Sequence, residues 1–271
     1  MGSLSHPPSR TQSPSPSFPF PTDPSTAHLP AILCLHGGGS NATVFKIQTR
    51  RLYWRLSSRF RFVFAQGPIE GEPGWGMLPT FASLAPFHRW VSRRFQPGER
   101  GDELVPTSEV EVIDDIILRA MEENGGRSSF VGVMGFSQGA RLAAGLVLRQ
   151  QLERRERGFS KWGFRFGIFI GGPFPPFGLV DEDWQLDYPV MGQVPTVHAW
   201  GRSDHVRQGA KELADACDGP DTFVMDFEGG HHLPLTDDEA EELCGLVVDA
   251  WHAAGGKDQK GLVNRLGVSV E

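Results

Sequence analysis

Short apolar runs alternate with amphipathic segments along most of the chain, which is the pattern of an α/β protein. Runs with strand-like composition lie at residues 31–35, 60–65, 130–136, 165–170, 195–200 and 222–227. Between them the apolar positions recur with a helical period, over residues 41–58, 108–121, 138–155, 206–217 and 236–253. Strands that are apolar throughout are buried on both faces. The sequence therefore predicts a mostly parallel, doubly wound sheet flanked by helices.

Three of the predicted helices begin with recognisable capping residues. Asn41 is expected to cap the first helix with its side-chain oxygen. Ser108-x-x-Glu111 and Thr236-x-x-Glu239 match the capping box, in which two residues three positions apart exchange side-chain and backbone hydrogen bonds. We therefore expect helices to begin directly after Asn41, Ser108 and Thr236.

Composition separates a central domain from two tails. Residues 1–28 are dense in proline and serine and bury too little apolar surface to order themselves, so we expect a disordered leader. Residues 255–271 are polar and are expected to form a C-terminal tail. The remaining residues, 29–254, are expected to form one α/β domain. Within it, residues 67–106 hold aromatic side chains among prolines and glycines, as an irregular insertion.

Charge and cysteine content exclude several classes of partner. The formal net charge is −7, which argues against nucleic acid as a partner. Three cysteines without paired spacing suggest neither a disulfide framework nor a zinc site, and Cys34 is expected in the core. The chain has no apolar run long enough to span a membrane and no apolar signal segment at its start. The sequence thus predicts a cytoplasmic protein that binds neither nucleic acid nor membrane.

The most informative motif joins the predicted strand 130–136 to the helix that follows it. The residues Gly135-Phe136-Ser137-Gln138-Gly139 match Gly-x-Ser-x-Gly, the nucleophile elbow that holds a reactive serine on a sharp strand-to-helix turn. The glycines leave room for that tight crossing. The five residues alone are weak support, because roughly one chain in four of this composition would match by chance. Their value depends on the elements around them.

Two later residues are suited to activate Ser137. A serine hydroxyl is a weak nucleophile that needs an imidazole base, and a carboxylate must orient that base. Asp204 and His231 each follow a predicted strand that ends in glycine, in the chain order serine, acid, histidine. The sequence predicts a catalytic triad of Ser137, Asp204 and His231, with His232 as an alternative base. The competing interpretation of Asp204 alone is a simple helix cap.

The loop His36-Gly37-Gly38-Gly39 follows the first strand and is suited to complete an oxyanion hole. We expect the backbone amides of Gly38 and Gln138 to be the two donors, with the Gly39 amide as the alternative to that of Gly38. Gly39 is also expected to contact the substrate, and His36 to brace the loop. The adjacent histidines His231 and His232 invite a metal interpretation, but no further ligands stand at suitable spacing. We therefore expect no metal and no cofactor.

An apolar substrate channel is the remaining expectation for the site. Aromatic residues of the insertion and of the segment after the strand 165–170 are predicted to line it, namely Trp75, Phe81, Phe87, Trp90 and Phe174. The alternative is that these rings pack the core beneath a thin loop.

Six segments of the chain together carry a family resemblance: Leu33-Cys34-Leu35-His36-Gly37, Gln66-Gly67-Pro68, Phe87-His88-Arg89-Trp90, the elbow, Gly201-x-x-Asp204 and Gly230-His231-His232-Leu233-Pro234. Over roughly residues 29–252 the chain resembles the fungal serine hydrolase (FSH) family of the α/β-hydrolase superfamily. The resemblance implies an α/β-hydrolase domain at 29–254. By position it assigns the family's nucleophile to Ser137, its acid to Asp204 and its base to His231.

The resemblance also implies an activity: an esterase or thioesterase that releases or trims a polyketide-type acyl product in secondary metabolism. The implied substrate is a small-molecule or carrier-bound acyl group, and a polyketide synthase carrier domain is a candidate partner. Arginines between residues 50 and 61 are a candidate surface for an acidic carrier, although a solvated helix face explains them more simply. An acyltransferase with the same triad and a non-catalytic, hydrolase-like binding protein stay open as alternatives.

Overall fold

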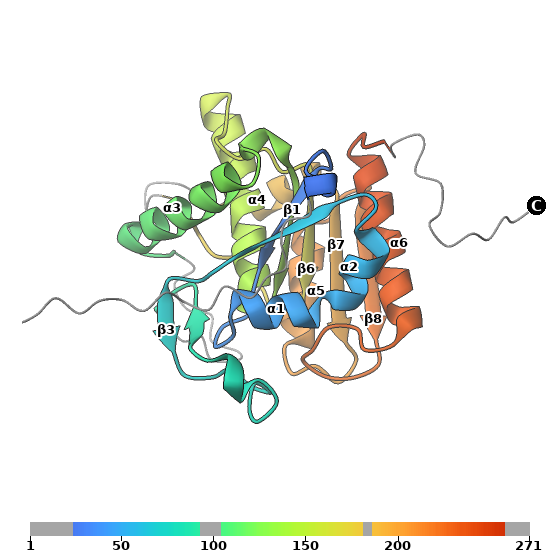
Figure 1. Cartoon of the computed structure of the whole chain (residues 1–271). Helices are drawn as coiled ribbons and strands as arrows, with labels where there is room; N and C mark the ends of the chain where they lie inside the picture. The colour runs from blue at the N-terminus through green and yellow to red at the C-terminus, as the bar shows by residue number, and fades with distance from the viewer. Residues whose placement is uncertain (1–23, 93–103, 181–185, 258–271) are drawn as a thin grey trace, which may run out of the picture.

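The computed structural model describes residues 24–92, 104–180 and 186–257. Its centre is a six-stranded sheet in the order β2-β1-β5-β6-β7-β8, with every neighbouring pair parallel (Figure 1). The strands are β1 Ala31–Leu35, β2 Arg61–Ala65, β5 Phe130–Phe136, β6 Phe166–Ile170, β7 Thr196–Gly201 and β8 Thr222–Phe227. A separate antiparallel pair, β3 Ile69–Gly71 and β4 Phe87–Arg89, lies within the predicted insertion. The parallel sheet predicted from the apolar runs is confirmed.

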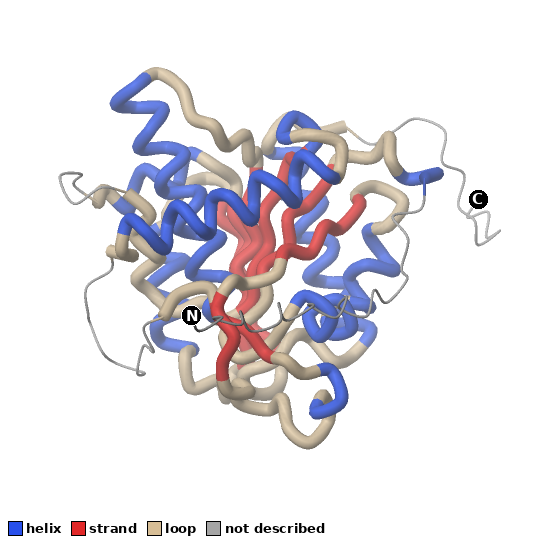
Figure 2. The backbone as a smooth tube through the Cα atoms, turned by 60° about the vertical axis from the view of Figure 1, so that its left-hand side comes forward, coloured by secondary structure: helices blue, strands red, loops and turns tan. Residues whose placement is uncertain are grey.

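Helices cover both faces of the central sheet (Figure 2). Residues of α3, α4 and α5 contribute to one core cluster, and residues of α1, α2 and α6 contribute to the other. The helices are α1 Ala42–Gln48, α2 Arg50–Leu56, α3 Thr107–Glu123, α4 Gln138–Arg157, α5 Arg207–Ala216 and α6 Asp237–Ala253. The fold is therefore three layers, with the sheet in the middle.

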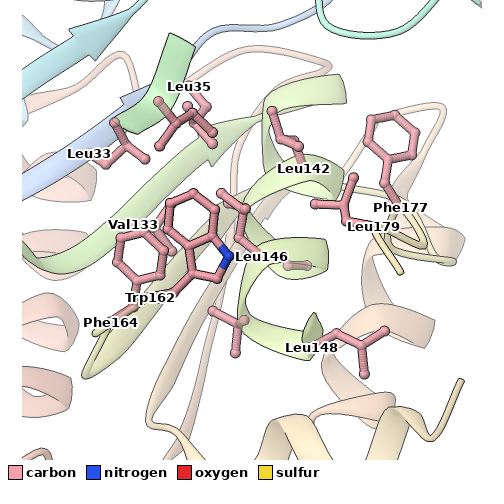
Figure 3. Packing of buried hydrophobic residues seen from close by; sticks show 14 of the residues in the cluster. Leu33, Leu35, Val133, Leu142, Leu146, Leu148, Trp162, Phe164, Phe177 and Leu179 are labelled. Atoms are coloured by element: carbon pink, nitrogen blue, oxygen red, sulfur yellow. The ribbon is translucent and has the colours of Figure 1, made fainter. Parts of the chain in front are cut away.

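The strand β1 shows why apolar runs form the middle layer. Successive side chains of a strand point to opposite faces. Leu33 and Leu35 lie in the core shared with α4 and the strand residue Val133 (Figure 3). Ile32 and Cys34 lie in the other core cluster, on the opposite face. All four β1 side chains are fully buried. Each such large apolar side chain contributes about 1.5–3 kcal/mol when removed from water.

Two of the three predicted helix starts are confirmed. Asn41 caps α1, its side-chain oxygen accepting the Val44 backbone N–H at 2.8 Å. Thr236 and Glu239 form the predicted capping box at the start of α6. The helix expected over 41–58 is interrupted, however: α1 ends at Gln48 and α2 begins at Arg50. The Thr49 hydroxyl between them donates to the Phe45 carbonyl at 2.8 Å.

The capping box predicted at Ser108 is wrong. The helix α3 begins at Thr107, directly after Pro106, and its N-cap has no side-chain hydrogen bond. Ser108 therefore lies inside the first turn. A proline with its fixed φ defines the helix start here without a side-chain acceptor.

All six strands of the central sheet are parallel, so their carboxyl ends lie along the same edge of the sheet. From β1 the chain moves outward to β2 on one side, and from β5 it proceeds through β6 and β7 to β8 on the other. In open parallel sheets, ligands bind beyond the carboxyl ends of the strands where the strand order reverses, and here that point lies between β1 and β5. Loops after β1, β5, β7 and β8 hold all the residues predicted for the triad and the oxyanion hole.

The structure describes only part of each predicted tail, and it places all three cysteines in the interior. The predicted leader lies outside the described residues as far as residue 23, and Pro24–Thr26 forms a short 3-10 helix. The predicted tail lies outside them from residue 258 onward. All three cysteines are buried and unpaired, and the prediction that Cys34 lies in the core is confirmed. None of the helices within the described ranges has the length and apolar character needed to cross a bilayer.

Candidate active site

Ser137 stands on a strained turn between β5 and α4. Its φ of 55° and ψ of −118° form a combination that L-residues rarely adopt, and among the described residues it is the only non-glycine with positive φ. Such a conformation costs of order 1–3 kcal/mol and persists only where the surrounding structure enforces it. Here the Ser137 amide donates to the Ile170 carbonyl of β6 at 2.9 Å. The turn lifts the hydroxyl out of the sheet edge.

The two glycines of the elbow are required by close backbone approach. A β-carbon on Gly135 would lie 2.0 Å from the Gly139 carbonyl oxygen. A β-carbon on Gly139 would lie 2.1 Å from the Leu35 carbonyl oxygen and 2.5 Å from that of His36. All three distances are far below van der Waals contact, and the atoms involved are backbone. The tight crossing inferred from the sequence thus brings α4 directly against the end of β1.

Substituting Gly139 should unfold the elbow. We expect Gly139→Ala to lower the free energy of unfolding by about 3 kcal/mol or more, because the new methyl group overlaps the Leu35 backbone. The matched control is Gly245→Ala on α6, where a β-carbon meets no atom within 4 Å. That control should gain about 0.5–1 kcal/mol from the better helix propensity of alanine. Urea denaturation of the two variants measures both values, and equal stability would contradict this account.

The structure brings the three predicted triad residues together. The His231 Nε2 lies 2.8 Å from the Ser137 hydroxyl, and its Nδ1 lies 2.9 Å from Asp204 Oδ2. The second carboxylate oxygen of Asp204 accepts the Val206 backbone N–H at 2.9 Å. The side chain of Asp204 is 1% exposed and that of His231 is 10% exposed. A continuous line of hydrogen bonds therefore runs from a buried carboxylate to the serine hydroxyl.

Asp204 is held in its charged form by its neighbours. Burial by itself would raise the pKa of this carboxyl, but the hydrogen bond and the charge interaction with His231 outweigh that effect. The Val206 amide and the nearby His205 act in the same direction, so that the pKa of Asp204 lies below its ordinary value. An ionised carboxylate is what an adjacent imidazolium requires for stabilisation.

Two residues that the sequence did not single out adjoin the His231 ring. The Phe136 ring lies against it, with centroids 4.8 Å apart. On another side, Gly171 after β6 adopts a φ of 56°, and a β-carbon there would lie 3.2 Å from the His231 ring and 3.4 Å from Asp204 Oδ2. The only signal of Gly171 in the sequence was its place at a strand end.

His232 does not face the serine, so the alternative base is excluded in this geometry. Its Nε2 accepts the Gly230 backbone N–H at 3.1 Å, and its Nδ1 lies 2.8 Å from the Leu233 carbonyl. Both ring nitrogens are thus committed to the backbone of the same loop. His232 shapes the loop that presents His231.

The backbone amides of Gly38 and Gln138 are both available as donors beside Ser137. Gln138 is the first residue of α4, and no atom of the described residues accepts its N–H or that of Gly38. The preceding Gly37 lies close to the elbow, since a β-carbon on it would be 3.5 Å from the Ser137 β-carbon. These are the donors that the sequence predicted, and their part in an oxyanion hole stays a prediction.

The prediction that Gly39 contacts substrate does not fit its backbone. The Gly39 N–H donates to the His88 carbonyl at 2.8 Å, and its own carbonyl accepts the Gly74 N–H at 2.8 Å. With a φ of 70°, a β-carbon at Gly39 would lie 2.2 Å from the Gly74 nitrogen. Gly39 is therefore the point where the loop after β1 turns tightly against the insertion.

Gln138 also fixes the neighbouring chain through its side chain. Its Oε1 accepts the Trp90 backbone N–H at 2.8 Å, and the same side chain lies next to Gly38. The Trp90 indole N–H in turn donates to the His36 carbonyl at 2.8 Å. The elbow helix, the insertion and the loop after β1 are thereby tied together at the site.

His36 braces this loop, as the sequence predicts. Its Nε2 accepts the Gly67 backbone N–H at 2.9 Å and must therefore be unprotonated. The proton resides on Nδ1, which donates to the Gly37 carbonyl at 2.8 Å. Burial lowers the pKa of His36 to about 4, only partly opposed by that hydrogen bond and with a small further lowering from His88. The ring is a neutral structural link between β1 and the turn after β2.

We expect the free energy of unfolding to decrease as the pH is lowered, because His36 is buried in its neutral form. Its pKa is about 4 in the folded protein and about 6.5 when unfolded, so the unfolded chain binds the extra proton first. The neutral His36 ring therefore contributes to the free energy of unfolding. That contribution is fully present above pH 6.5 and declines toward pH 4. Between pH 7.5 and pH 5, the free energy of unfolding should fall by about 2 kcal/mol because of His36. His198, with a pKa lowered to about 3 by burial, adds a similar loss.

The measurement is urea denaturation at pH 7.5 and pH 5. In His36→Gln the decline between the two pH values should be about 2 kcal/mol smaller than in the wild type. His252→Gln, at an exposed position on α6, is the control and should decline like the wild type. An undiminished decline in His36→Gln would contradict the assignment.

Two rings predicted to line a substrate channel lie in the core instead. Trp90 is fully buried in the core cluster between the sheet and α4. Phe87 is 5% exposed and packs with Val44 and Met77 in a small cluster under the insertion. Neither side chain presents a surface to a ligand, so the alternative of core packing is correct for these two. Through these contacts, and the Trp90 hydrogen bonds to Gln138 and His36, the insertion packs against the rest of the domain.

The other three rings differ in their exposure. Trp75 is 79% exposed, and its ring centroid lies 6.4 Å from that of His205. Phe81 packs half-buried against the cluster of Phe87, and Phe174 lies half-buried with its ring 4.9 Å from that of Tyr188. Among the aromatic residues predicted to line the channel, Trp75 is thus the one that is exposed to solvent next to the loop of Asp204.

His205 is a neighbour of the triad that the sequence did not indicate. It directly follows Asp204, and its Nδ1 lies 3.5 Å from Asp204 Oδ1. Its ring centroid lies 4.8 Å from that of His231, nearly perpendicular to it. Asp204, His205 and His231 each offer one ligand atom within 4.8 Å of the others. The pair that invited a metal interpretation in the sequence was a different one, His231 and His232.

Comparison with known proteins agrees with the geometry of the site. The family described as serine hydrolase (FSH1) matches residues 26–243. The esterase citA of Monascus ruber is 36% identical over 232 residues, covering 78% of this chain and 87% of that protein. The thioesterase FSL2 of Gibberella zeae is 35% identical over 243 residues, covering 84% of this chain and 94% of that protein.

Comparison with a solved structure identifies the fold. The acyl-protein thioesterase 2 of Zea mays matches with a TM-score of 0.55 and 16% identity, covering 82% of this chain and 94% of that one. At that identity the likeness shows the α/β-hydrolase fold alone. The family match covers most of the chain and includes Ser137, Asp204 and His231. The chain belongs to the FSH1 family of serine hydrolases.

Proposed function

We propose that this serine hydrolase cleaves an ester or thioester through an acyl-enzyme formed on Ser137. The observation that carries the proposal is the hydrogen-bonded series Ser137–His231–Asp204, with distances of 2.8 and 2.9 Å. In such a series the imidazole takes the serine proton as the hydroxyl attacks, and the buried carboxylate stabilises the imidazolium. A purely binding role would leave the strained Ser137 backbone without a use.

Acylation begins when Ser137 Oγ attacks the carbonyl carbon of the substrate. Its proton passes to His231 Nε2, and the carbonyl oxygen becomes an oxyanion. The amides of Gly38 and Gln138 are the donors that we assign to this oxyanion, and stabilisation of this kind is commonly worth about 3–4 kcal/mol per donor. Collapse of the intermediate breaks the bond to the leaving alcohol or thiol. That group receives the proton from Nε2.

Deacylation repeats the sequence with water as the nucleophile. Water gives a proton to His231 Nε2 while its oxygen attacks the acyl carbon. The new oxyanion occupies the same two amides. The bond to Ser137 Oγ then breaks, the serine recovers its proton from the imidazole, and a carboxylic acid leaves.

The substrate proposed is a small-molecule or carrier-bound acyl group of the polyketide type. Relatives named as esterase and as thioesterase support both leaving groups. We place the acyl part beside Trp75, the exposed ring next to the loop of Asp204. A carrier domain of a synthase is the proposed partner for a thioester. The arginine run is a poor docking surface for it, because Arg51 and Arg55 both pair with Asp237 at 3.3 and 3.2 Å.

A fluorophosphonate probe tests the proposal directly. Such a probe phosphonylates only a serine that an adjacent base activates. Intact-mass analysis should show one adduct, and peptide analysis should place it on Ser137. Ser137→Ala should remain unlabelled, whereas Ser108→Ala, at an exposed position on α3, should label like the wild type. An unlabelled wild type would favour the non-catalytic binding protein. Product analysis with and without an acceptor alcohol separates hydrolysis from acyl transfer.

A further inference from the structure

The neighbourhood of Asp204 has the composition of a metal site. Asp204, His205 and His231 present a carboxylate and two imidazoles to one small region, with their ligand atoms all within 4.8 Å of one another. His231 Nδ1 lies 2.9 Å from Asp204 Oδ2, and His205 Nδ1 lies 3.5 Å from the other oxygen of the same carboxylate, Oδ1. In a tetrahedral zinc site with bonds of about 2.0–2.1 Å, neighbouring ligand atoms lie about 3.3 Å apart. The observed separations lie on either side of that value.

Solvent reaches Asp204 and His205 from the side of α5. A cavity of about 390 Å³ is lined by Asp204, His205, Arg207, Gln208 and Lys211. The His205 side chain is 51% exposed, so it can turn toward its neighbours without disturbing the core. Arg207 and Lys211 are cationic and oppose a metal ion. We therefore expect binding that a chelator reverses quickly, unlike that of a structural zinc site.

We propose that Zn²⁺ binds to Asp204, His205 and His231 and thereby switches off the serine nucleophile. A neutral imidazole holds one proton. When the metal occupies His231 Nδ1, that proton must reside on Nε2. Nε2 is then a donor toward Ser137 and has no lone pair to accept the hydroxyl proton. The inhibitory effect rests on the proposed function, whereas the binding of zinc does not.

Binding is tested first, by isothermal titration calorimetry of the full-length chain with zinc chloride. The Ser137→Ala variant is included because its zinc site should be intact whatever the activity of the protein. Loss of one ligand in His205→Gln should weaken this site by about tenfold or more. The control is His252→Gln, which removes an exposed histidine from α6 and should bind like the wild type. Unchanged zinc affinity in His205→Gln would overturn the proposal.

Inhibition is tested next, as the ratio of labelling rates by the fluorophosphonate probe with and without zinc. The wild type and His252→Gln should be slowed by zinc and restored by EDTA. His205→Gln should need about tenfold more zinc for the same slowing. Zinc that binds at His205 but leaves the labelling rate unchanged would also overturn the proposal. If the wild type is not labelled at all, the proposed function fails, and calorimetry still decides whether the metal site exists.

Discussion

Ser137→Ala should reduce kcat for a short p-nitrophenyl ester by about six orders of magnitude. The hydroxyl is the atom that forms the acyl bond, and no other described hydroxyl lies within hydrogen-bonding distance of the His231 ring. The oxyanion donors and the base remain, but without a nucleophile they act only on water. Initial rates with purified protein at several substrate concentrations give the measurement.

The control for this variant is Ser108→Ala, which removes an exposed hydroxyl from the first turn of α3. It should retain the wild-type kcat and KM. Circular dichroism of Ser137→Ala should match that of the wild type, since only the hydroxyl is removed from the turn. Turnover in a folded Ser137→Ala protein that remains near the wild-type rate would end the proposal of an acyl-enzyme.

Asp204→Asn should reduce kcat by about four orders of magnitude with little change in KM. The Val206 N–H already occupies the Oδ1 position, so the amide oxygen of asparagine should remain there. The amide NH₂ group then replaces Oδ2 and donates to His231 Nδ1, where the carboxylate had accepted. The imidazole must place its proton on Nε2. In that tautomer it cannot take the proton of Ser137.

Asp215→Asn is the matched control, because the same change is made at an exposed position of α5. It should leave kcat and KM unchanged. If Asp204→Asn kept more than about a hundredth of the wild-type kcat, Asp204 would have to be a structural residue of its loop rather than the residue that orients His231. The hydrogen bond from the Val206 N–H would still be present in that case, so stability alone could not separate the two roles.

The parts of the fold that depend on local pattern were predictable. The β1 run is apolar on both faces, and the structure buries it on both faces. The elbow glycines were predictable because their function is steric and local. The capping box at Thr236 formed, whereas the one at Ser108 did not, since that helix begins at Thr107, directly after Pro106 and two residues before the predicted start. A capping motif defines a helix start only where no stronger constraint precedes it.

The aromatic residues show where the pattern gives no answer. Trp75 and Trp90 stand in the same proline- and glycine-rich segment, yet one is 79% exposed and the other is fully buried. Trp90 pairs with Gln138 and His36, which are distant in sequence. Neither hydrophobicity nor spacing predicts which ring finds such partners. The choice depends on long-range contacts that form only after the sheet has assembled.

The sequence by itself determined the order of the strands along the chain, the chemistry of the nucleophile and the loops that hold its partners. It did so because strand periodicity, elbow glycines and residue type act within a few positions. Only the tertiary structure decided that His231 rather than His232 faces Ser137, that Phe87 and Trp90 belong to the core, and that His205 lies against the triad. Those outcomes depend on which way a side chain points where several loops meet. The loops meet only after the sheet has formed, because they come from strands that are far apart in the sequence.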